Sequence, residues 1–331
     1  MMIQVFYLCS LEAQRRSITM SNYVGQMQSF YQHKHIVVTG GCGFIGSHVA
    51  QALIELGAQV TIIDNLITVR EENIAAYKNQ ITFIKGSITD FDLCVQTTKN
   101  ADLIFHLAAF ISVPQSVEKP LECHNTNVNG TANLLEAARI NNVPRFIFSS
   151  SASVYGDTQE PCSEKTPFNP QSPYAWSKLI GEHYCKQYTD LFGVHTISMR
   201  YFNVYGARQN PHAPYAAAVA LFKYRMDRNE PITFFGDGMQ TRDFVPVETV
   251  AETNLLLGML PKSYLNGDVY NVATGKSINL FELFALIKPA YPAYNIPIQF
   301  APARNGDVRH AIADCNKLAQ LKKRCLETLP T

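Results

Sequence analysis

Residues 36–47 read IVVTGGCGFIGS, an apolar run followed by a glycine-rich turn and the start of a helical pattern. Gly40 permits a tight turn, Gly43 lets backbone amides approach a pyrophosphate, and Gly46 allows the helix to pack close to the strand. The spacing is GxxGxxG rather than GxGxxG, so the loop needs support from the rest of the chain. The residues of this loop expected to bind a dinucleotide are Gly40, Gly43, Phe44, Ile45 and Gly46.

Apolar runs typical of buried strands alternate with helical patterns from residue 35 onward. Strands separated by segments of helix length imply right-handed crossovers and a parallel sheet with helices on both faces. We therefore expect an α/β fold with a doubly wound parallel sheet of the Rossmann type. The expected strands are His35–Thr39, Val60–Ile63, Ile81–Lys85, Leu103–Leu107, Phe146–Ser149 and Thr196–Met199.

The second expected strand ends in Asp64, at the place where a dinucleotide-binding sheet holds a ribose diol. A carboxylate there repels the 2′-phosphate of NADP, so NAD is the expected cofactor. Small residues after residue 106 would let the cofactor approach the backbone, and an asparagine-rich helix start at residues 125–131 offers side-chain amides. The further residues expected to contact NAD are Asn65, Ile88, Leu107, Ala108, Ala109 and Asn127.

A tyrosine and a lysine four residues apart, Tyr174 and Lys178, lie at the start of an expected helix and share one of its faces. The lysine ammonium can then lie near the phenol and favour its phenolate, which makes Tyr174 a candidate base. The serines at 149–151 and 153 follow an expected strand and place hydroxyls at the carboxyl edge of the sheet. Together these residues indicate proton transfer to or from a hydroxyl group.

The composition excludes several classes of function. Across 331 residues, 28 Lys and Arg face 27 Asp and Glu, so no net field favours nucleic acid or an anionic membrane surface. The eight cysteines show no CxxC pair or metal-ligand spacing, which indicates reduced thiols, a cytosolic location and no metal site. No segment reaches 18 apolar residues without charge, so no membrane helix is expected.

Three regions are expected along the chain. Residues 1–33 fit the rest poorly and are expected to form a disordered or loosely docked extension, with Met20 as an alternative start. Residues 34–200 form the NAD-binding domain, to which later segments return. Residues 201–331, punctuated by prolines, form mainly a smaller substrate-binding domain.

The ordered motifs from Gly40 to about Asp314 resemble the extended short-chain dehydrogenase/reductase family, and within it the nucleotide-sugar 4-epimerases. The matching motifs are TGGCGFIGSH, IIDN, FHLAA, NVNGTANLLEAAR, FSSSASVYGD, SPYAWSK, RYFNVYGARQNP, GDGMQTRDFVPVE and ARNGDVRHAIAD. The resemblance implies that Tyr174 is the catalytic base, that Lys178 binds the nicotinamide ribose and lowers the tyrosine pKa, and that Ser151 bonds the sugar 4-hydroxyl. It also implies a homodimer built through two helices of each copy.

The second half of the chain is expected, by the same resemblance, to hold a nucleoside diphosphate. Guanidinium groups suit phosphate oxygens, and a carboxylate suits a ribose diol. The residues expected to bind substrate are Ser151, Ser153, Asn203, Phe235, Arg242, Arg304, Asp307 and Ala311, with Ser150 as a neighbouring candidate. Ala311 occupies the position that is large when only plain hexoses are accepted and small when N-acetyl sugars enter.

The expected reaction is NAD-dependent 4-epimerisation of a UDP-hexose through a 4-keto intermediate, with UDP-N-acetylglucosamine and its galacto epimer turned over at least as well as the UDP-glucose pair. The stretch Ala152-Ser153-Val154 lacks the carboxylates that dehydratases and decarboxylases resembling this family carry, so epimerisation outranks both reactions. A dehydratase, a decarboxylase or a reductase acting on a nucleotide sugar is kept as the alternative. A non-catalytic NAD-binding sensor is a further alternative. Two departures from the family are Ser87, where an adenine-contacting Asp is usual, and an altered end after residue 315.

Overall fold

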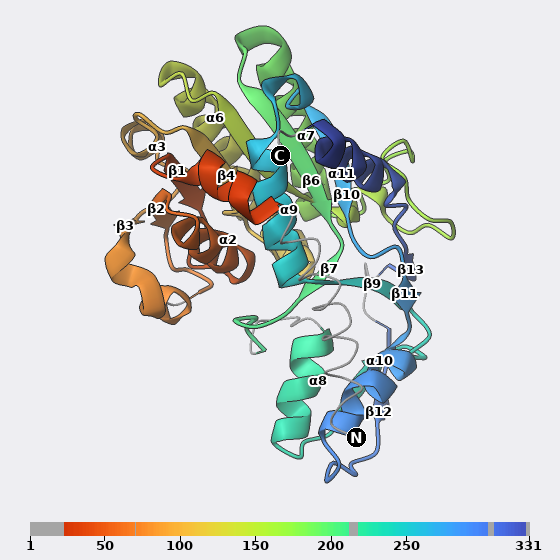
Figure 1. Ribbon diagram of the computed structural model, residues 1–331. Coiled ribbons are helices and arrows are strands. Elements are labelled where there is room, and N and C mark those ends of the chain that lie inside the picture. Colours follow the sequence, from red (N-terminus) through yellow and green to blue (C-terminus); the bar gives the residue numbers. More distant parts are fainter. Residues whose placement is uncertain (1–22, 70, 212–217, 304–307, 329–331) are drawn as a thin grey trace.

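The computed structural model describes residues 23–69, 71–211, 218–303 and 308–328. A seven-stranded parallel sheet, in the order β10-β6-β5-β4-β1-β2-β3, forms its centre (Figure 1). Its strands are β1 (His35–Thr39), β2 (Gln59–Asp64), β3 (Ile81–Lys85), β4 (Leu103–His106), β5 (Arg145–Ser151), β6 (His195–Tyr201) and β10 (Asp268–Val272). The central strands β1 and β4 are buried apolar runs, as expected for strands covered on both faces, whereas the edge strand β3 is only partly buried.

Helices cover both faces of this sheet, which confirms the doubly wound α/β fold. One face packs against α2 (Phe44–Glu55) and α9 (Val247–Met259), and the other packs against α3 (Phe91–Thr97), α6 (Gly130–Ile140) and α7 (Pro173–Phe192). Shorter elements complete the crossovers: η1 (Glu71–Gln80), α4 (Val113–Glu118), α5 (Pro120–His124), η2 (Asn125–Asn129) and η3 (Ala152–Tyr155).

The strand order reverses between β1 and β4, since β2 and β3 extend to one side and β5, β6 and β10 to the other. In parallel sheets, ligands bind beyond the carboxyl ends of the strands at such a switch point. Thr39 and His106 are register partners at the ends of β1 and β4 and mark its position. The glycine loop and the end of β4 therefore meet where a cofactor is expected.

A smaller part of the chain lies beyond the carboxyl edge of the main sheet, at the bottom of Figure 1. It has its own apolar cluster around Phe222 and Phe234. Its strand β9 (Thr241–Pro246) pairs with β7 (Asn203–Tyr205), β11 (Ser277–Ile278) and β13 (His310–Ala311). The remaining elements are β8 (Thr233–Phe235) paired with β12 (Gln299–Ala301), α8 (Ala218–Asp227), α10 (Leu280–Ile287), η4 (Lys262–Tyr264) and η5 (Lys288–Ala290).

The expectation of a disordered or loosely docked extension over 1–33 is wrong from residue 23 onward. Residues 23–31 are helical, and Tyr23, Met27 and Tyr31 form a buried stripe in the core shared with α9. The Tyr31 hydroxyl donates to the carbonyl oxygen of Leu255 at 2.6 Å, and burial raises the pKa of this phenol well above its usual value. Residues 1–22 lie outside the described residues.

The segment after Asp314 is also regular, although its sequence departs from the family pattern. Residues 316–328 form α11 (Asn316–Thr328), whose Leu318 and Leu321 are buried against the main core. The hydroxyl of Tyr23 donates to the carbonyl oxygen of Lys322 at 3.0 Å. The first described helix and the last one are thus tied together on one face of the sheet.

Candidate active site

The glycine loop has the close approaches that its sequence predicts. Gly40 has φ +69°, and a Cβ there would lie 2.7 Å from the backbone nitrogen of Ala108 at the end of β4. A Cβ at Gly46 would lie 2.2 Å from the carbonyl oxygen of Gly40. Gly43 is the N-cap of α2, and no side chain at this position bonds to the first backbone amides of the helix, those of Phe44 and Ile45. These amides at the helix N-terminus fit a pyrophosphate.

Asp64 ends β2 beside this loop, and its carboxylate is 7% exposed. Its two oxygens accept from the backbone nitrogens of Cys42 at 3.0 Å and Leu66 at 2.9 Å. Burial raises the pKa of Asp64, and the two backbone donors oppose that rise. The neighbouring Asn65 is exposed, and its Oδ1 accepts from the backbone nitrogen of Ile67 at 3.2 Å. The carboxylate lies where a ribose diol would be held.

The end of β4 is ordered by a buried histidine. His106 lies between the hydroxyls of Thr39, 2.8 Å from Nδ1, and Thr131, 2.9 Å from Nε2. Burial, assisted by the nearby positive charge of Lys178, lowers the pKa of His106 to about 3, so the ring is neutral. The Thr39 hydroxyl also accepts from the backbone nitrogen of Ala108 at 3.2 Å. This arrangement fixes the partly buried Leu107, Ala108 and Ala109 facing the glycine loop.

Two other residues expected to contact the cofactor have protein partners. Asn127 in η2 is buried: its Oδ1 accepts from the backbone nitrogen of Phe110 at 2.7 Å, and its Nδ2 donates to Ser177 Oγ at 2.8 Å. It thereby joins the loop after β4 to α7. Ile88 packs against Gly130, where a Cβ would meet its side chain at 2.6 Å. Ser87, the expected departure at the adenine contact, bonds to the hydroxyl of Thr89 at 2.8 Å.

The tyrosine, lysine and serine predicted to act together do lie together. The side chain of Ser172 caps α7 by accepting from the backbone nitrogen of Ala175 at 3.1 Å, so Tyr174 lies in the first helical turn. The Lys178 ammonium lies 5.9 Å from the centroid of the Tyr174 ring and donates to the carbonyl oxygen of Ser149 at 2.7 Å. Ser151, at the end of β5, hydrogen-bonds to Tyr174.

In the chain without ligands, the pKa values of Tyr174 and Lys178 both shift toward the neutral forms, and the lowering of the tyrosine pKa by Lys178 stays a prediction. Burial raises the pKa of Tyr174 to about 12, the hydrogen bond to Ser151 opposes that rise, and the nearby Cys123 adds to it. Burial also lowers the pKa of Lys178 to about 8. The physical reason is that desolvation penalises both charged forms, while the ammonium is directed at the carbonyl oxygen of Ser149 instead of the phenol.

The other serines of the cluster point to different partners. Ser150 is 3% exposed and donates to Glu182 Oε1. Ser153 has a buried hydroxyl with no hydrogen-bond partner among the described residues, while its backbone nitrogen donates to Ser151 Oγ at 3.2 Å. An unpartnered buried hydroxyl beside Ser151 fits a polar ligand.

The expected substrate residues of the second half gather around β9. Arg242 on β9 is the register partner of Ala311 on β13, and Asn203 on β7 donates to the carbonyl oxygen of Asp243 at 3.4 Å. Phe235 ends β8 beside this sheet and is partly buried. Arg304 and Asp307 lie outside the described residues.

A buried ion pair between α7 and β6 was not predicted from the sequence. Glu182 and Arg200, 5% and 1% exposed, join through Arg200 Nη2 and Glu182 Oε2 at 2.6 Å. Two features of the sequence could have indicated it. Glu182 follows Lys178 by four residues and so lies on the same face of α7, and Arg200 is a charge inside an apolar strand.

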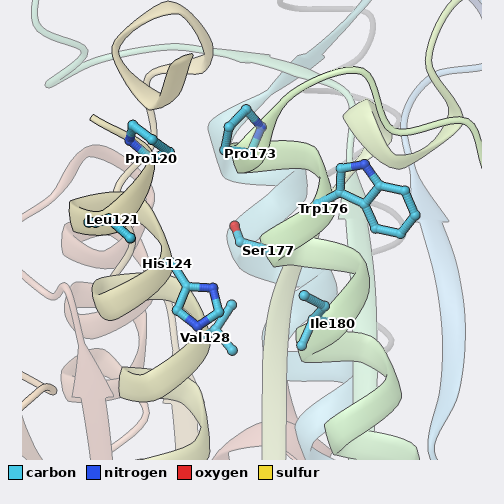
Figure 2. A pocket seen from close by; sticks show the side chains of 8 residues that line it. All are labelled: Pro120, Leu121, His124, Val128, Pro173, Trp176, Ser177 and Ile180. Carbon is cyan, nitrogen blue, oxygen red and sulfur yellow. The ribbon is translucent and has the colours of Figure 1, made fainter. Parts of the chain in front are cut away.

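An apolar face lies on the outer side of α5 and α7 (Figure 2). Leu121 is 82% exposed and Trp176 is 53% exposed, and the two flank a shallow pocket. Large exposed apolar side chains gathered in one patch are typical of interaction surfaces. The other residues that line the pocket are Pro120, His124, Val128, Pro173, Ser177 and Ile180.

The part of the chain that the structure describes contains neither a helix able to span a membrane nor a cluster of metal-ligating side chains. None of the helices in the described ranges combines the length and the apolar character that a membrane crossing requires. Among the same residues, no three His, Cys, Asp or Glu side chains cluster as metal ligands would.

A site with a dinucleotide-type glycine loop and a Tyr-Lys-Ser set defines an enzyme-like member of the nucleotide-binding α/β proteins. The family model for the NAD dependent epimerase/dehydratase family matches residues 36–273, and the chain belongs to this family. A putative UDP-glucose 4-epimerase from Methanocaldococcus jannaschii is 40% identical over 291 residues, which cover 86% of this chain and 92% of that protein. These matches confirm the resemblance read from the motifs.

Solved structures of similar proteins agree with this family membership. A UDP-N-acetylglucosamine 4-epimerase from Methanobrevibacter ruminantium, in complex with UDP-N-acetylmuramic acid, has a TM-score of 0.82 and 37% identity, covering 91% of this chain and 94% of its own. A Thermus thermophilus UDP-glucose 4-epimerase in complex with NAD has a TM-score of 0.79 and 34% identity, covering 87% of this chain and 92% of its own.

Proposed function

We propose that this protein is an NAD-dependent UDP-sugar 4-epimerase, and that the UDP-N-acetylglucosamine and UDP-N-acetylgalactosamine pair is turned over at least as well as the UDP-glucose pair. The observation that carries this function is the arrangement of Tyr174, Lys178 and Ser151 at the carboxyl edge of the sheet, beside the glycine loop. The similar 4-epimerases support the reaction type.

The residues present fit NAD. The amides at the start of α2 would hold the pyrophosphate, Asp64 the adenine ribose and Lys178 the nicotinamide ribose. Bound NAD would supply a reversible hydride acceptor for the sugar C4 position. Asp64 would also disfavour the additional phosphate of NADP.

Tyr174 would take the proton of the 4-hydroxyl and later return it, while Ser151 would hold the 4-oxygen in place. The 4-keto sugar must turn over in the site to present its other face, so the protein has to grip the nucleotide more tightly than the sugar. Asn203, Phe235 and Arg242, with Arg304 and Asp307, would hold the uridine diphosphate. Ser153 would offer its unpartnered hydroxyl to the sugar.

Ala311 would admit the N-acetyl group, because its side chain is small and lies on β13 beside Arg242. Around Ser151 the sequence Ala152-Ser153-Val154 supplies no carboxylate for elimination or decarboxylation. We also propose that a second copy covers the apolar face of α5 and α7, giving a homodimer. Six described cysteines are free thiols, which supports a cytosolic location.

The test is to incubate the purified protein with each UDP-sugar in turn, without added reductant, and to follow the products by NMR. Interconversion of the C4 epimers with no net change in NADH absorbance is the expected result. Accumulated NADH would instead indicate a dehydrogenase. A 4-keto-6-deoxy sugar as the product would indicate a dehydratase, and carbon dioxide released from a UDP-uronate would indicate a decarboxylase. Binding of NAD without any product would indicate a sensor.

A further inference from the structure

Three polar residues form a row across the buried face of the main sheet beneath α7. Ser150 on β5 and Asn271 on β10 are both register partners of Arg200 on β6. All three are at most 3% exposed. Apolar side chains would be the ordinary choice at such positions, since burying polar groups costs free energy unless each is hydrogen-bonded. We call these three residues the polar row.

Glu182 of α7 is the residue that the polar row holds. Its Oε1 accepts from Ser150 Oγ and from Arg200 Nε, the latter at 2.8 Å, and its Oε2 accepts from Arg200 Nη2 at 2.6 Å. Arg200 also donates from Nη1 to the hydroxyl of Tyr155 at 2.8 Å, and that hydroxyl donates to Asn271 Oδ1 at 2.7 Å. One carboxylate on the helix is therefore fixed to two strands, and through Tyr155 to a third.

The same helix face carries the two proposed catalytic residues. Tyr174, Lys178 and Glu182 are spaced by four residues, so they lie one above another on α7. Each contacts one of three consecutive residues of β5: Tyr174 bonds to Ser151, Lys178 to the carbonyl oxygen of Ser149, and Glu182 to the side chain of Ser150. The Glu182 contact lies between the other two along β5, and Glu182 touches no reacting atom.

A purely stabilising role explains this arrangement poorly. A buried ion pair is weak evidence for stability, because the desolvation of two charges offsets their attraction, and apolar residues of similar volume often serve as well. The ion pair also constrains geometry. A bidentate guanidinium and a hydroxyl together fix both the position of the Glu182 carboxylate over the sheet and its rotation. That constraint passes along α7 to the Lys178 and Tyr174 side chains one and two turns earlier.

We propose, on the basis of the 4-epimerase function inferred above, that Glu182 is a positioning residue which, with Arg200 and Ser150, sets the register of α7 on β5 so that Tyr174 can transfer the proton beside Ser151. Removing the constraint lowers kcat by about 10²-fold, the effect of a small misplacement of reacting groups, and leaves the binding of UDP unchanged. Substrate KM then changes far less than kcat.

The main variant is the double substitution Glu182→Met/Arg200→Met, which removes both charges together and leaves no unpaired ion in the core. Ser150→Ala is the second variant, since it removes only the hydroxyl link and keeps the ion pair. Asp190→Asn is the matched control: it removes an exposed carboxylate that pairs with Lys186 on a later turn of the same helix. We expect the control to keep the wild-type kcat.

Three measurements separate positioning from stability: kcat and KM for the epimerised sugar, the Kd of UDP by calorimetry, and amide hydrogen exchange in the first turn of α7. Support requires a lower kcat with an unchanged Kd and faster exchange in that turn, for the double variant or, if it does not fold, for Ser150→Ala. A folded variant with wild-type kcat and exchange overturns the role of Glu182. If the wild type interconverts no sugar, the 4-epimerase function fails, and the exchange measurement alone still decides whether α7 is positioned in this way.

Discussion

Arg242 on β9 and Ala311 on β13 are register partners in a parallel pair, so a residue proposed to grip a phosphate and one proposed to admit the sugar substituent are neighbours in a single small sheet. The strand carrying Ala311 is held from outside the sheet as well. The Asp157 carboxylate accepts from the backbone nitrogens of Arg309 at 3.0 Å and His310 at 3.2 Å. The position of Ala311 relative to Arg242 is thereby fixed.

Substituting Ala311→Tyr should reduce kcat/KM for UDP-N-acetylglucosamine by about 5- to 150-fold, because overpacking costs about 1–3 kcal/mol and each 1.4 kcal/mol is tenfold. Turnover of UDP-glucose should change little. The ratio of kcat/KM for UDP-N-acetylglucosamine to kcat/KM for UDP-glucose is measured for the wild type, for Ala311→Tyr and for the small-residue control Ala311→Ser. Unchanged turnover of UDP-N-acetylglucosamine in the tyrosine variant would refute the proposal that Ala311 admits the N-acetyl group.

Tyr174→Phe should lower kcat by about 10²–10⁴-fold, the usual contribution of a positioned acid-base group, while UDP binding persists. Because burial raises the pKa of Tyr174 to about 12, the ligand-free protein should hold this phenol neutral near pH 7. The check is an ultraviolet difference titration of tyrosinate between wild type and variant. A tyrosinate signal specific to Tyr174 below pH 8 in the ligand-free protein would contradict the raised pKa.

His106 should make the protein less stable as the pH falls below its unfolded-state pKa. The folded-state pKa is about 3 against 6.5 in the unfolded chain, so between these values the unfolded state binds more protons and stability rises with pH. From above pH 6.5 down to pH 5, the loss assigned to this one group is about 2 kcal/mol. Urea unfolding at several pH values gives the free energy of unfolding as a function of pH. The slope of this curve should be shallower for His106→Gln than for the wild type, and the exposed His124→Gln is the control. An identical slope in the His106 variant would contradict this assignment.

Asp64→Asn should reduce the preference for NAD over NADP by about tenfold, since it removes a negative charge from the place where the 2′-phosphate would lie. Calorimetric titration of cofactor-free protein with each dinucleotide measures the two Kd values. Asp90→Asn, which alters an exposed residue at the start of α3, is the control. An unchanged NAD-to-NADP ratio would show that Asp64 does not face the adenosine ribose.

Leu121→Glu should convert a dimer into a monomer if a second copy covers the apolar face of α5 and α7, because a buried unpaired carboxylate is strongly unfavourable. Light scattering over a range of protein concentrations reports the mass. Phe300→Glu, at an exposed aromatic residue of the small domain, is the matched control. A wild-type protein that is monomeric throughout would rule out the homodimer.

The fold could be predicted from the sequence because its evidence is local. The apolar run before Gly40, the glycine spacing, and the position of Asp64 at a strand end each require only a few neighbouring residues. The same holds for Tyr174 and Lys178, which one helix face brings together. The structure confirms these elements and their order.

What could not be predicted depends on contacts between distant segments. The helix of residues 23–31 is short and half polar, and its buried stripe is covered by α9 and α11. The spacing from Lys178 and the charge inside an apolar strand single out Glu182 and Arg200, but that the two side chains meet depends on a contact between helix and strand. The spacing also places Lys178 on the same helix face as Tyr174, but it does not fix the ammonium, which bonds to the carbonyl oxygen of Ser149.

The bond from Tyr31 to Leu255 has a consequence for biosynthesis. Its two residues are 224 positions apart. At ribosomal rates of about 5–20 residues per second, the first helix waits roughly 10 to 45 s before its partner is made. During that time the stripe of Tyr23, Met27 and Tyr31 has no α9 to cover it, so the nascent chain presents an apolar surface of the kind that chaperones bind.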